Sequence, residues 1–151
     1  MKVAVNISPL KSAHKDRGIG YYTRNLVENL KADNSITMFE FTDMGEIKEA
    51  DIIHYPWFDL YFHTLPIKKT CPTVVTIHDV IPLVFRDHYP VGFKGKVNLI
   101  LQKISLGSCK QIITDSEASK KDIIKYIRIK AGKITVVHLA ADARFKVVNN
   151  D

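Results

Sequence analysis

The segment TVVTIHDVIPL, residues 73–83, decides the fold. Residues 73–78 form a continuous run of β-branched and apolar residues, which is typical of a strand covered on both faces, as in a parallel sheet. Pro72 and Asp79 bound this run and define the ends of the strand. His78 is therefore expected at the carboxyl end of a buried strand, which is where open α/β sheets bind their ligands.

Strands and helices alternate on both sides of this segment. Further strands are predicted at 2–7, 36–41, 51–55, 110–114 and 134–138. Helices are predicted at 19–33, 91–106 and 117–129. Pro82 and Pro90 predict a loop before the second of these helices. The alternation predicts an α/β fold, a Rossmann-like, doubly wound and mainly parallel sheet with helices on both faces. We expect one domain at 1–145, with 146–151 beginning a linker.

The chain shows no export or membrane-spanning segment. Its first ten residues, MKVAVNISPL, lack the long apolar region and small-residue cleavage site of a signal peptide. No apolar stretch approaches the roughly 18 residues that span a bilayer. We therefore expect a cytoplasmic protein, either free or at the inner face of the membrane. Cys71 and Cys109 are widely separated and are expected to be reduced and structural.

The formal net charge of +6 implies attraction to anions without naming them. The densest basic cluster surrounds the predicted helix 117–129 and comprises Lys120, Lys121, Lys125, Arg128, Lys130 and Lys133. Such a run is most often a solvated helix face. The alternative is contact with an anionic membrane surface or a lipid-linked phosphate. No nucleic-acid-binding motif is present, so nucleic acid is not an expected partner.

Gly18 and Gly20 immediately precede the first predicted helix. Glycines at such a position let backbone N–H groups approach a phosphate, whose negative charge the helix dipole favours. The pattern is not a dinucleotide fingerprint, because Thr23 stands where a third glycine is needed and the preceding loop is long. A flexible loop that merely leads into a helix remains an alternative.

Three histidines lie at the carboxyl ends of predicted strands and a serine follows a fourth, all at the edge expected to bind ligands. They are His54, His78, His138 and Ser116, of which Ser116 is expected to cap the helix that follows it. Three histidines at one edge could bind zinc, but no ligand spacing supports this and no metal is expected. Aromatic residues crowd the loop 56–66, where packing on the core and stacking on sugars are both open.

Five segments in order resemble glycosyltransferase family 4, a large family of retaining enzymes. Residues 18–26, GIGYYTRNL, resemble its "GIGRYTRNL" loop and helix, and 76–83, TIHDVIPL, resemble its "TIHDLIPL". Residues 112–123, IITDSEASKKDI, are similar to its "IITVSEFSKKDI". The remaining two matches are its third strand at 51–56 and its "ITVVYNGVDERF" segment at 134–145.

The resemblance implies a GT-B architecture, in which two Rossmann-like domains face a cleft. The N-terminal domain binds the acceptor, a sugar or a lipid-linked molecule, and the C-terminal domain binds the nucleotide-sugar, which is a co-substrate and not a cofactor. Residues implied to contribute are His78 and Asp79 at the reaction centre, Gly18 and Gly20 at the donor diphosphate, and Arg24, His54, Tyr55, Ser116 and Glu117 at the substrates. A role in polysaccharide biosynthesis is implied as well.

The family's Glu-x7-Glu motif has no counterpart here, since no two Glu residues lie eight apart. That motif belongs to the donor-binding C-terminal domain, which is the expected partner of this chain, and we expect the chain alone to transfer no sugar. Two other readings stay open. One is a self-sufficient NAD-type enzyme, for which Glu40 or Asp43 has the spacing of a ribose-binding acid but the glycine turn is wrong. The other is a non-catalytic basic module that binds an anionic membrane or a partner protein.

Overall fold

The computed structural model describes residues 1–47, 49–141 and 145. Within them lies a six-stranded sheet of order β2-β1-β3-β4-β5-β6, in which every neighbouring pair is parallel. The strands are β1 (Lys2–Asn6), β2 (Thr37–Phe41), β3 (Ile52–Tyr55), β4 (Thr73–Thr76), β5 (Gln111–Thr114) and β6 (Ile134–Val136). The predicted Rossmann-like α/β sheet is confirmed.

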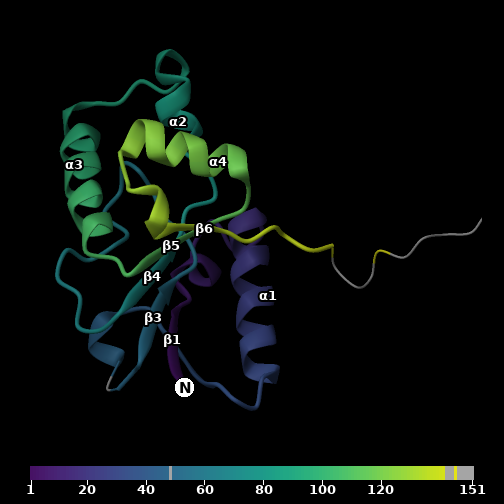
Figure 1. The fold of residues 1–151 in the computed structure, drawn as a ribbon. Helices are drawn as coiled ribbons and strands as arrows, with labels where there is room; N and C mark the ends of the chain where they lie inside the picture. Colours follow the sequence, from purple (N-terminus) through teal and green to yellow (C-terminus); the bar gives the residue numbers. More distant parts are fainter. Residues whose placement is uncertain (48, 142–144, 146–151) are drawn as a thin grey trace, which may run out of the picture.

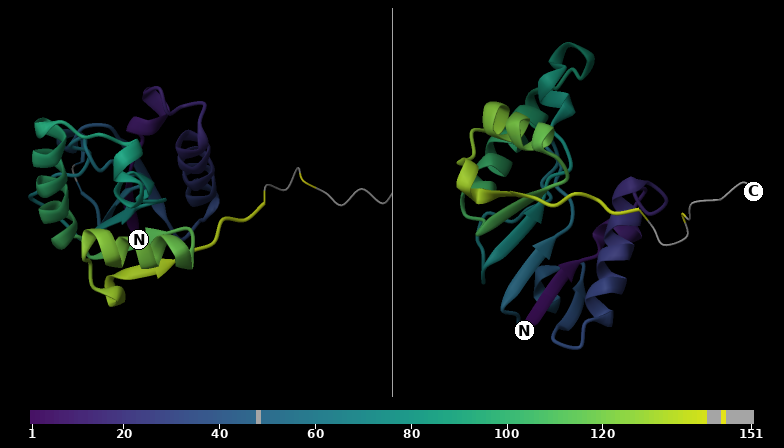
Figure 2. Two further views of the ribbon diagram at one scale, coloured as in Figure 1. Left: turned by 90° about the horizontal axis from the view of Figure 1, so that it is seen from above. Right: turned by 45° about the vertical axis from the view of Figure 1, so that its right-hand side comes forward.

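Helices cover both faces of the sheet. Helix α1 (Gly18–Ala32) and helix α3 (Phe93–Gly107) lie on opposite sides of the strands (Figure 1). Helix α4 (Glu117–Asp122) continues as the π-helix η4 (Ile123–Ile127) and crosses near the ends of β5 and β6, as the view from above also shows (Figure 2). Because all the strands are parallel, β1 and β5, which lead into α1 and α4, end at the same edge of the sheet.

Two apolar clusters reflect the two faces. The smaller cluster places Val3 and Val5 of β1 against Val27 of α1. The larger cluster takes the other face of the sheet and includes Val75, Ile112 and, from α3, Leu106. Alternation along parallel strands explains the division, because successive side chains point to opposite faces.

The start of α1 depends on one close backbone approach. A Cβ at Gly20 would lie 2.3 Å from the carbonyl oxygen of Lys15, so only glycine lets the preceding loop pack on the helix. A Cβ at Gly18 would meet no atom of the described chain within 4 Å. Gly20 is therefore required by packing, whereas the surroundings of Gly18 are open.

Several short elements differ from the sequence prediction. Helix α2 (Ile81–Val84) and the 3-10 helix η3 (Arg86–His88) occupy a stretch predicted as loop, because Pro82 stands at the start of a helix and not within a turn. Two further 3-10 helices, η1 (Ser8–Lys11) and η2 (Met44–Glu46), also interrupt predicted loops, and η5 (Ala131–Lys133) precedes β6. The predicted linker at 146–151 lies outside the described residues.

No helix in the described part of the chain is both long and apolar enough to cross a bilayer.

Candidate functional site

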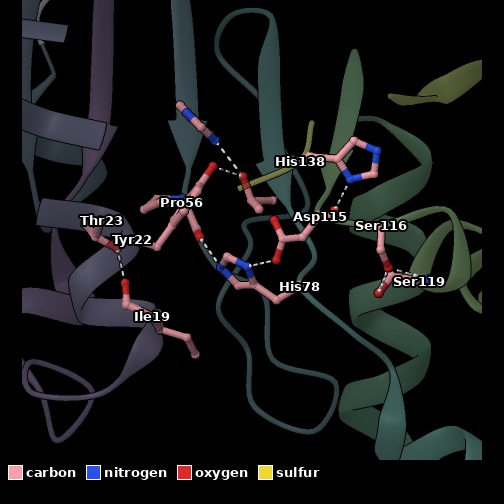
Figure 3. Close-up of polar contacts among 11 residues, drawn as sticks. Ile19, Tyr22, Thr23, Pro56, His78, Asp115, Ser116, Ser119 and His138 are labelled. Carbon is pink, nitrogen blue, oxygen red and sulfur yellow. Dashed lines mark hydrogen bonds and ion pairs between the residues drawn. The ribbon is translucent and has the colours of Figure 1, made fainter. Parts of the chain in front are cut away.

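The strand register brings His78 and Asp115 together. Thr76 of β4 is paired with Ile113 of β5, and two residues further along each chain stand His78 and Asp115. Their side chains meet with 2.6 Å between His78 Nδ1 and Asp115 Oδ2, and each is about one-fifth exposed. The pair lies at the carboxyl edge of the sheet (Figure 3).

Both ring nitrogens of His78 face acceptors. Nε2 lies 3.1 Å from the carbonyl oxygen of Pro56, at the end of the neighbouring strand β3, while Nδ1 faces the Asp115 carboxylate. A carbonyl oxygen can only accept, so Nε2 donates to it. Tyr22 of α1 packs edge-on against the ring with 4.8 Å between centroids. His78 is thus fixed in position and orientation from three sides.

A second series of hydrogen-bonded side chains lies next to this ring. His54 Nε2 is 2.9 Å from Thr76 Oγ1, which is itself 3.1 Å from the hydroxyl of Tyr22. Burial, with a smaller contribution from positive charge on His78, lowers the pKa of His54 to about 4. Burial also raises the pKa of Tyr22, and Asp115 adds to the rise. His54 is therefore a neutral, buried support and does not face solvent.

Helix α1 borders this network through Tyr22, at the start of its second turn. Arg17 precedes the helix without a side-chain capping bond to any described residue, and no acidic residue stands in the first turn. Its leading N–H groups thus offer a positive helix end with an open approach at Gly18. Arg24, one turn later, lies over the Tyr21 ring at 5.4 Å and donates to the Lys15 carbonyl at 3.5 Å. Tyr22, one turn after Gly18, is the contact that links this helix to His78.

Three further predicted residues begin helices at the same edge. Asp79 is exposed and its Oδ1 accepts from the N–H of Ile81 at 3.0 Å, which initiates α2. Ser116 is the N-cap of α4, as predicted, because its hydroxyl accepts from the N–H of Ser119 at 3.1 Å. Glu117 is exposed in the first turn of α4. They surround the pair of His78 and Asp115 without contacting its ring or carboxylate through a hydrogen bond that the described residues show.

Tyr55 lies apart from this edge network. It is buried in the larger apolar cluster, edge-on to Phe41 at 5.7 Å, and burial raises the pKa of its hydroxyl. It also lines an open pocket of about 450 Å³ beyond the ends of β1, β2 and β3. Polar and aromatic groups share that lining, among them Asn6, Thr42, Asp43, Trp57 and His63. Aromatic loop residues thus serve both the core and a surface hollow.

The three strand-end histidines do not converge on a metal. His54 bonds to Thr76, His78 to Asp115 and Pro56, and His138 to the main-chain oxygen of Asp115 at 3.1 Å. In the portion of the chain that the structure describes, no three His, Cys, Asp or Glu side chains are grouped to hold a metal ion. Cys71 and Cys109 are both free thiols.

Asp115, Tyr22 and Thr76 are site residues that the sequence prediction did not name. Asp115 directly follows a predicted strand, so its position carried a signal, and it stands where the family segment "IITVSEFSKKDI" has Val. One of its oxygens, Oδ1, is buried and has no hydrogen-bond partner among the described residues. Tyr22 carried no such signal, because its spacing is equally that of a core-facing helix residue.

Comparisons with known proteins agree with the motifs. A family model for Glycosyltransferase Family 4 matches residues 39–145. The O-antigen chain mannosyltransferase RfbU of Salmonella typhimurium is 32% identical to this chain over 77 residues. That match covers 50% of this chain and 20% of the Salmonella protein, so it represents a fifth of that protein's length.

Proposed function

The chain belongs to glycosyltransferase family 4, and we propose that it is the acceptor-binding N-terminal domain of a retaining glycosyltransferase that uses a nucleotide-sugar. One observation carries the proposal. His78 is held between Asp115 and the Pro56 carbonyl at the edge of a parallel sheet, and Tyr22 of α1, a helix whose start has no side-chain cap among the described residues, packs on its ring. A fixed hydrogen-bond donor next to a positive helix end suits a reaction that releases a diphosphate.

The start of α1 is the proposed contact for the donor diphosphate. Helix N-termini bind phosphates through free N–H groups and through the dipole of the helix. Gly18 leaves room for a ligand to approach, and Gly20 allows the loop to pack so that this turn is presented. As the bond between the sugar and the diphosphate breaks, negative charge grows on the leaving oxygen, and the helix end stabilises it more in the transition state than before.

His78 is the proposed catalytic donor, with Asp79 beside it at the mouth of the site. Asp115 accepts from Nδ1, which leaves Nε2–H as the outward donor. In the proposed complex this N–H exchanges the Pro56 carbonyl, at 3.1 Å, for an oxygen of the transferred sugar or of the phosphate. Ser116 and Glu117, at the start of α4, and Arg24, on α1, complete the substrate contacts of the proposal, while His54 supports the network from below.

The pocket beyond β1, β2 and β3 is the proposed acceptor site. Trp57 offers an aromatic face for a sugar ring, and the side chains of Asn6, Thr42 and Asp43 offer hydrogen bonds to hydroxyl groups. Tyr55 contributes to the floor of this pocket. A sugar, free or lipid-linked, matches such a mixed lining better than a wholly apolar ligand does, because the polar groups would otherwise be buried unpaired.

The experiment that tests the proposal supplies the donor-binding half. Residues 1–151 are assayed alone and fused to the C-terminal domain of a family 4 relative, with nucleotide-linked mannose as the first donor because the Salmonella relative is a mannosyltransferase. We expect transfer to a sugar or lipid-linked acceptor by the fusion and none by the chain alone. Transfer at ordinary enzymatic rates by residues 1–151 alone would contradict the two-domain proposal, as would failure of every acceptor to bind the chain.

A further inference from the structure

Helix α3 turns three uncharged polar side chains, Asn98, Gln102 and Ser105, inward. Gln102 and Ser105 are fully buried, and Gln102 Nε2 donates to the Asp59 carbonyl at 2.8 Å while its Oε1 accepts from the N–H of Leu65 at 3.3 Å. Asn98 Nδ2 donates to the Tyr61 carbonyl at 2.8 Å. The inner face of α3 thus binds the loop between β3 and β4 through hydrogen bonds, in addition to the packing of Leu99 and Leu106 on the core.

The outer face of the same helix is apolar. Phe93 is 84% exposed, Val97 39%, Ile100 59% and Ile104 54%. Successive separations of four, three and four residues place these side chains in one narrow stripe along the helix. At about 1.5 Å per residue the stripe is roughly 16 Å long. An ordinary surface helix turns polar side chains outward, so this exposed apolar stripe indicates contact with an apolar partner.

The charges around the stripe identify the kind of partner. Lys94 and Lys96 are exposed on opposite sides of it, and α3 contains no acidic residue. Two copies of α3 packed face to face would bring these lysines toward one another, which disfavours self-association. An anionic lipid surface satisfies both features, because the apolar stripe enters the acyl boundary while lysine ammonium groups reach the headgroup phosphates.

Exposed aromatic residues extend the surface at the start of α3. Phe62 and Tyr89 are 69% and 46% exposed, and both line a mainly open hollow of about 460 Å³ together with Lys94. Tyrosine and phenylalanine are side chains that settle at the boundary between acyl chains and headgroups. Lys94 lies both in this hollow and beside the stripe, so the two features adjoin at the start of α3.

We propose that the outer face of α3 docks in the plane of an anionic lipid bilayer. The surface consists of Phe93, Val97, Ile100 and Ile104 with Lys94 and Lys96 on its flanks. It differs from the basic cluster around α4, in which apolar side chains such as Ile123 and Ile127 face the core. The proposal needs no sugar transfer and stands independently of the proposed catalytic function.

Vesicle sedimentation tests this surface. Residues 1–151 are mixed with vesicles of phosphatidylcholine, or of phosphatidylcholine and phosphatidylglycerol in about equal parts. We expect binding to the anionic vesicles, weakened by salt, and little binding to phosphatidylcholine. Ile100→Asn should lower partitioning about threefold to tenfold, and Phe93→Asn with Ile100→Asn more than tenfold, because each removes apolar area from the lipid contact. Lys94→Glu with Lys96→Glu should reduce binding by a similar factor through the headgroups.

Matched controls separate the surface from general effects. Phe39→Asn changes another exposed apolar residue, on the edge strand β2, and Lys121→Glu with Lys125→Glu changes the basic cluster of α4. Both should bind like the wild type, and circular dichroism confirms that each variant is folded. Equal partitioning of the α3 variants and the wild type would overturn the proposal. So would loss of binding in the α4 variant alone, or a dimer in solution that Phe93→Asn with Ile100→Asn converts to monomer without any vesicle binding.

Discussion

His78 and Asp115 are 37 residues apart in sequence and 2.6 Å apart between Nδ1 and Oδ2. The pairing is a consequence of the β4–β5 register, since it continues the pairing of Thr76 with Ile113 by two residues. A carboxylate at this position forms a charge-assisted hydrogen bond with Nδ1 and fixes the orientation of the ring.

Asp115→Asn should weaken the hydrogen bond that holds Nδ1 of the His78 ring. The amide replaces a charge-assisted bond to a carboxylate by a bond between neutral groups, while Nε2 keeps its bond to the Pro56 carbonyl. Two-bond ¹H–¹⁵N correlation spectra report on each ring nitrogen, and the Nδ1 resonance should shift more than the Nε2 resonance. His54, whose ring bonds to Thr76, serves as the internal control. An unchanged Nδ1 resonance of His78 in the variant would show that Asp115 does not hold the ring.

His78→Ala should remove most activity while the domain still folds. Loss of a positioned donor of this kind typically lowers turnover by a factor on the order of 10²–10³. The structure adds a loss of stability of about 1–3 kcal/mol, because Asp115 is left without its ring partner. Melting temperature and turnover are measured on the same variant, fused to a donor-binding domain. Near-normal turnover per folded molecule, together with a large fall in melting temperature, would make His78 a structural residue.

Acidification should destabilise the fold through His54. Its pKa is about 4 when folded and 6.5 when unfolded, so between these values the unfolded chain binds a proton that the folded chain does not. Stability from this group is therefore complete above pH 6.5 and is lost as the pH falls toward 4, by about 2 kcal/mol at pH 5. Urea unfolding at pH 7 and pH 5 measures the loss. In His54→Asn the difference between the two pH values should shrink by that amount, and an unchanged difference would refute the assignment.

The two glycines of the first turn of α1 form a matched pair for stability. Gly20→Ala places a methyl group 2.3 Å from the Lys15 carbonyl oxygen and should destabilise the domain by about 1–3 kcal/mol. Gly18→Ala meets open space within the described structure and should leave stability unchanged or raise it by a few tenths of a kcal/mol. Thermal unfolding of both variants decides the matter. Equal effects would mean that the loop does not pack on Gly20 as described.

The regular elements could be predicted because their patterns are local. The run at 73–78 and the helical spacing after Gly18 located β4 and α1 to within two residues. Helix α2 was missed because Pro82 is compatible with a turn and with the first residues of a helix, and only the Asp79 bond to Ile81 distinguishes them. That hydrogen bond depends on the folded backbone, so the local sequence does not reveal it.

The sequence predicted which edge of the sheet carries the candidate site, but not which side chains pair with one another there. Strand ends placed His54 and His78 at the correct side of the sheet. Which side chain each would meet depends on strand order and register, which join segments far apart in sequence. Asp115 and Tyr22 entered the site through that geometry. The inward-facing polar side chains of α3 could not be predicted for a similar reason, because the spacing of its apolar residues does not show which face of the helix packs against the domain.

The polar anchors of α3 have an evolutionary consequence. Gln102 and Asn98 bind chiefly main-chain atoms of the loop between β3 and β4, namely the carbonyl groups of Asp59 and Tyr61 and the N–H of Leu65. Every amino acid except proline supplies both of these groups. The loop can therefore exchange its side chains, Trp57 among them, while its path over the domain is kept. Mutations in this loop can therefore change which ligands the neighbouring pocket binds while the fold of the domain is retained.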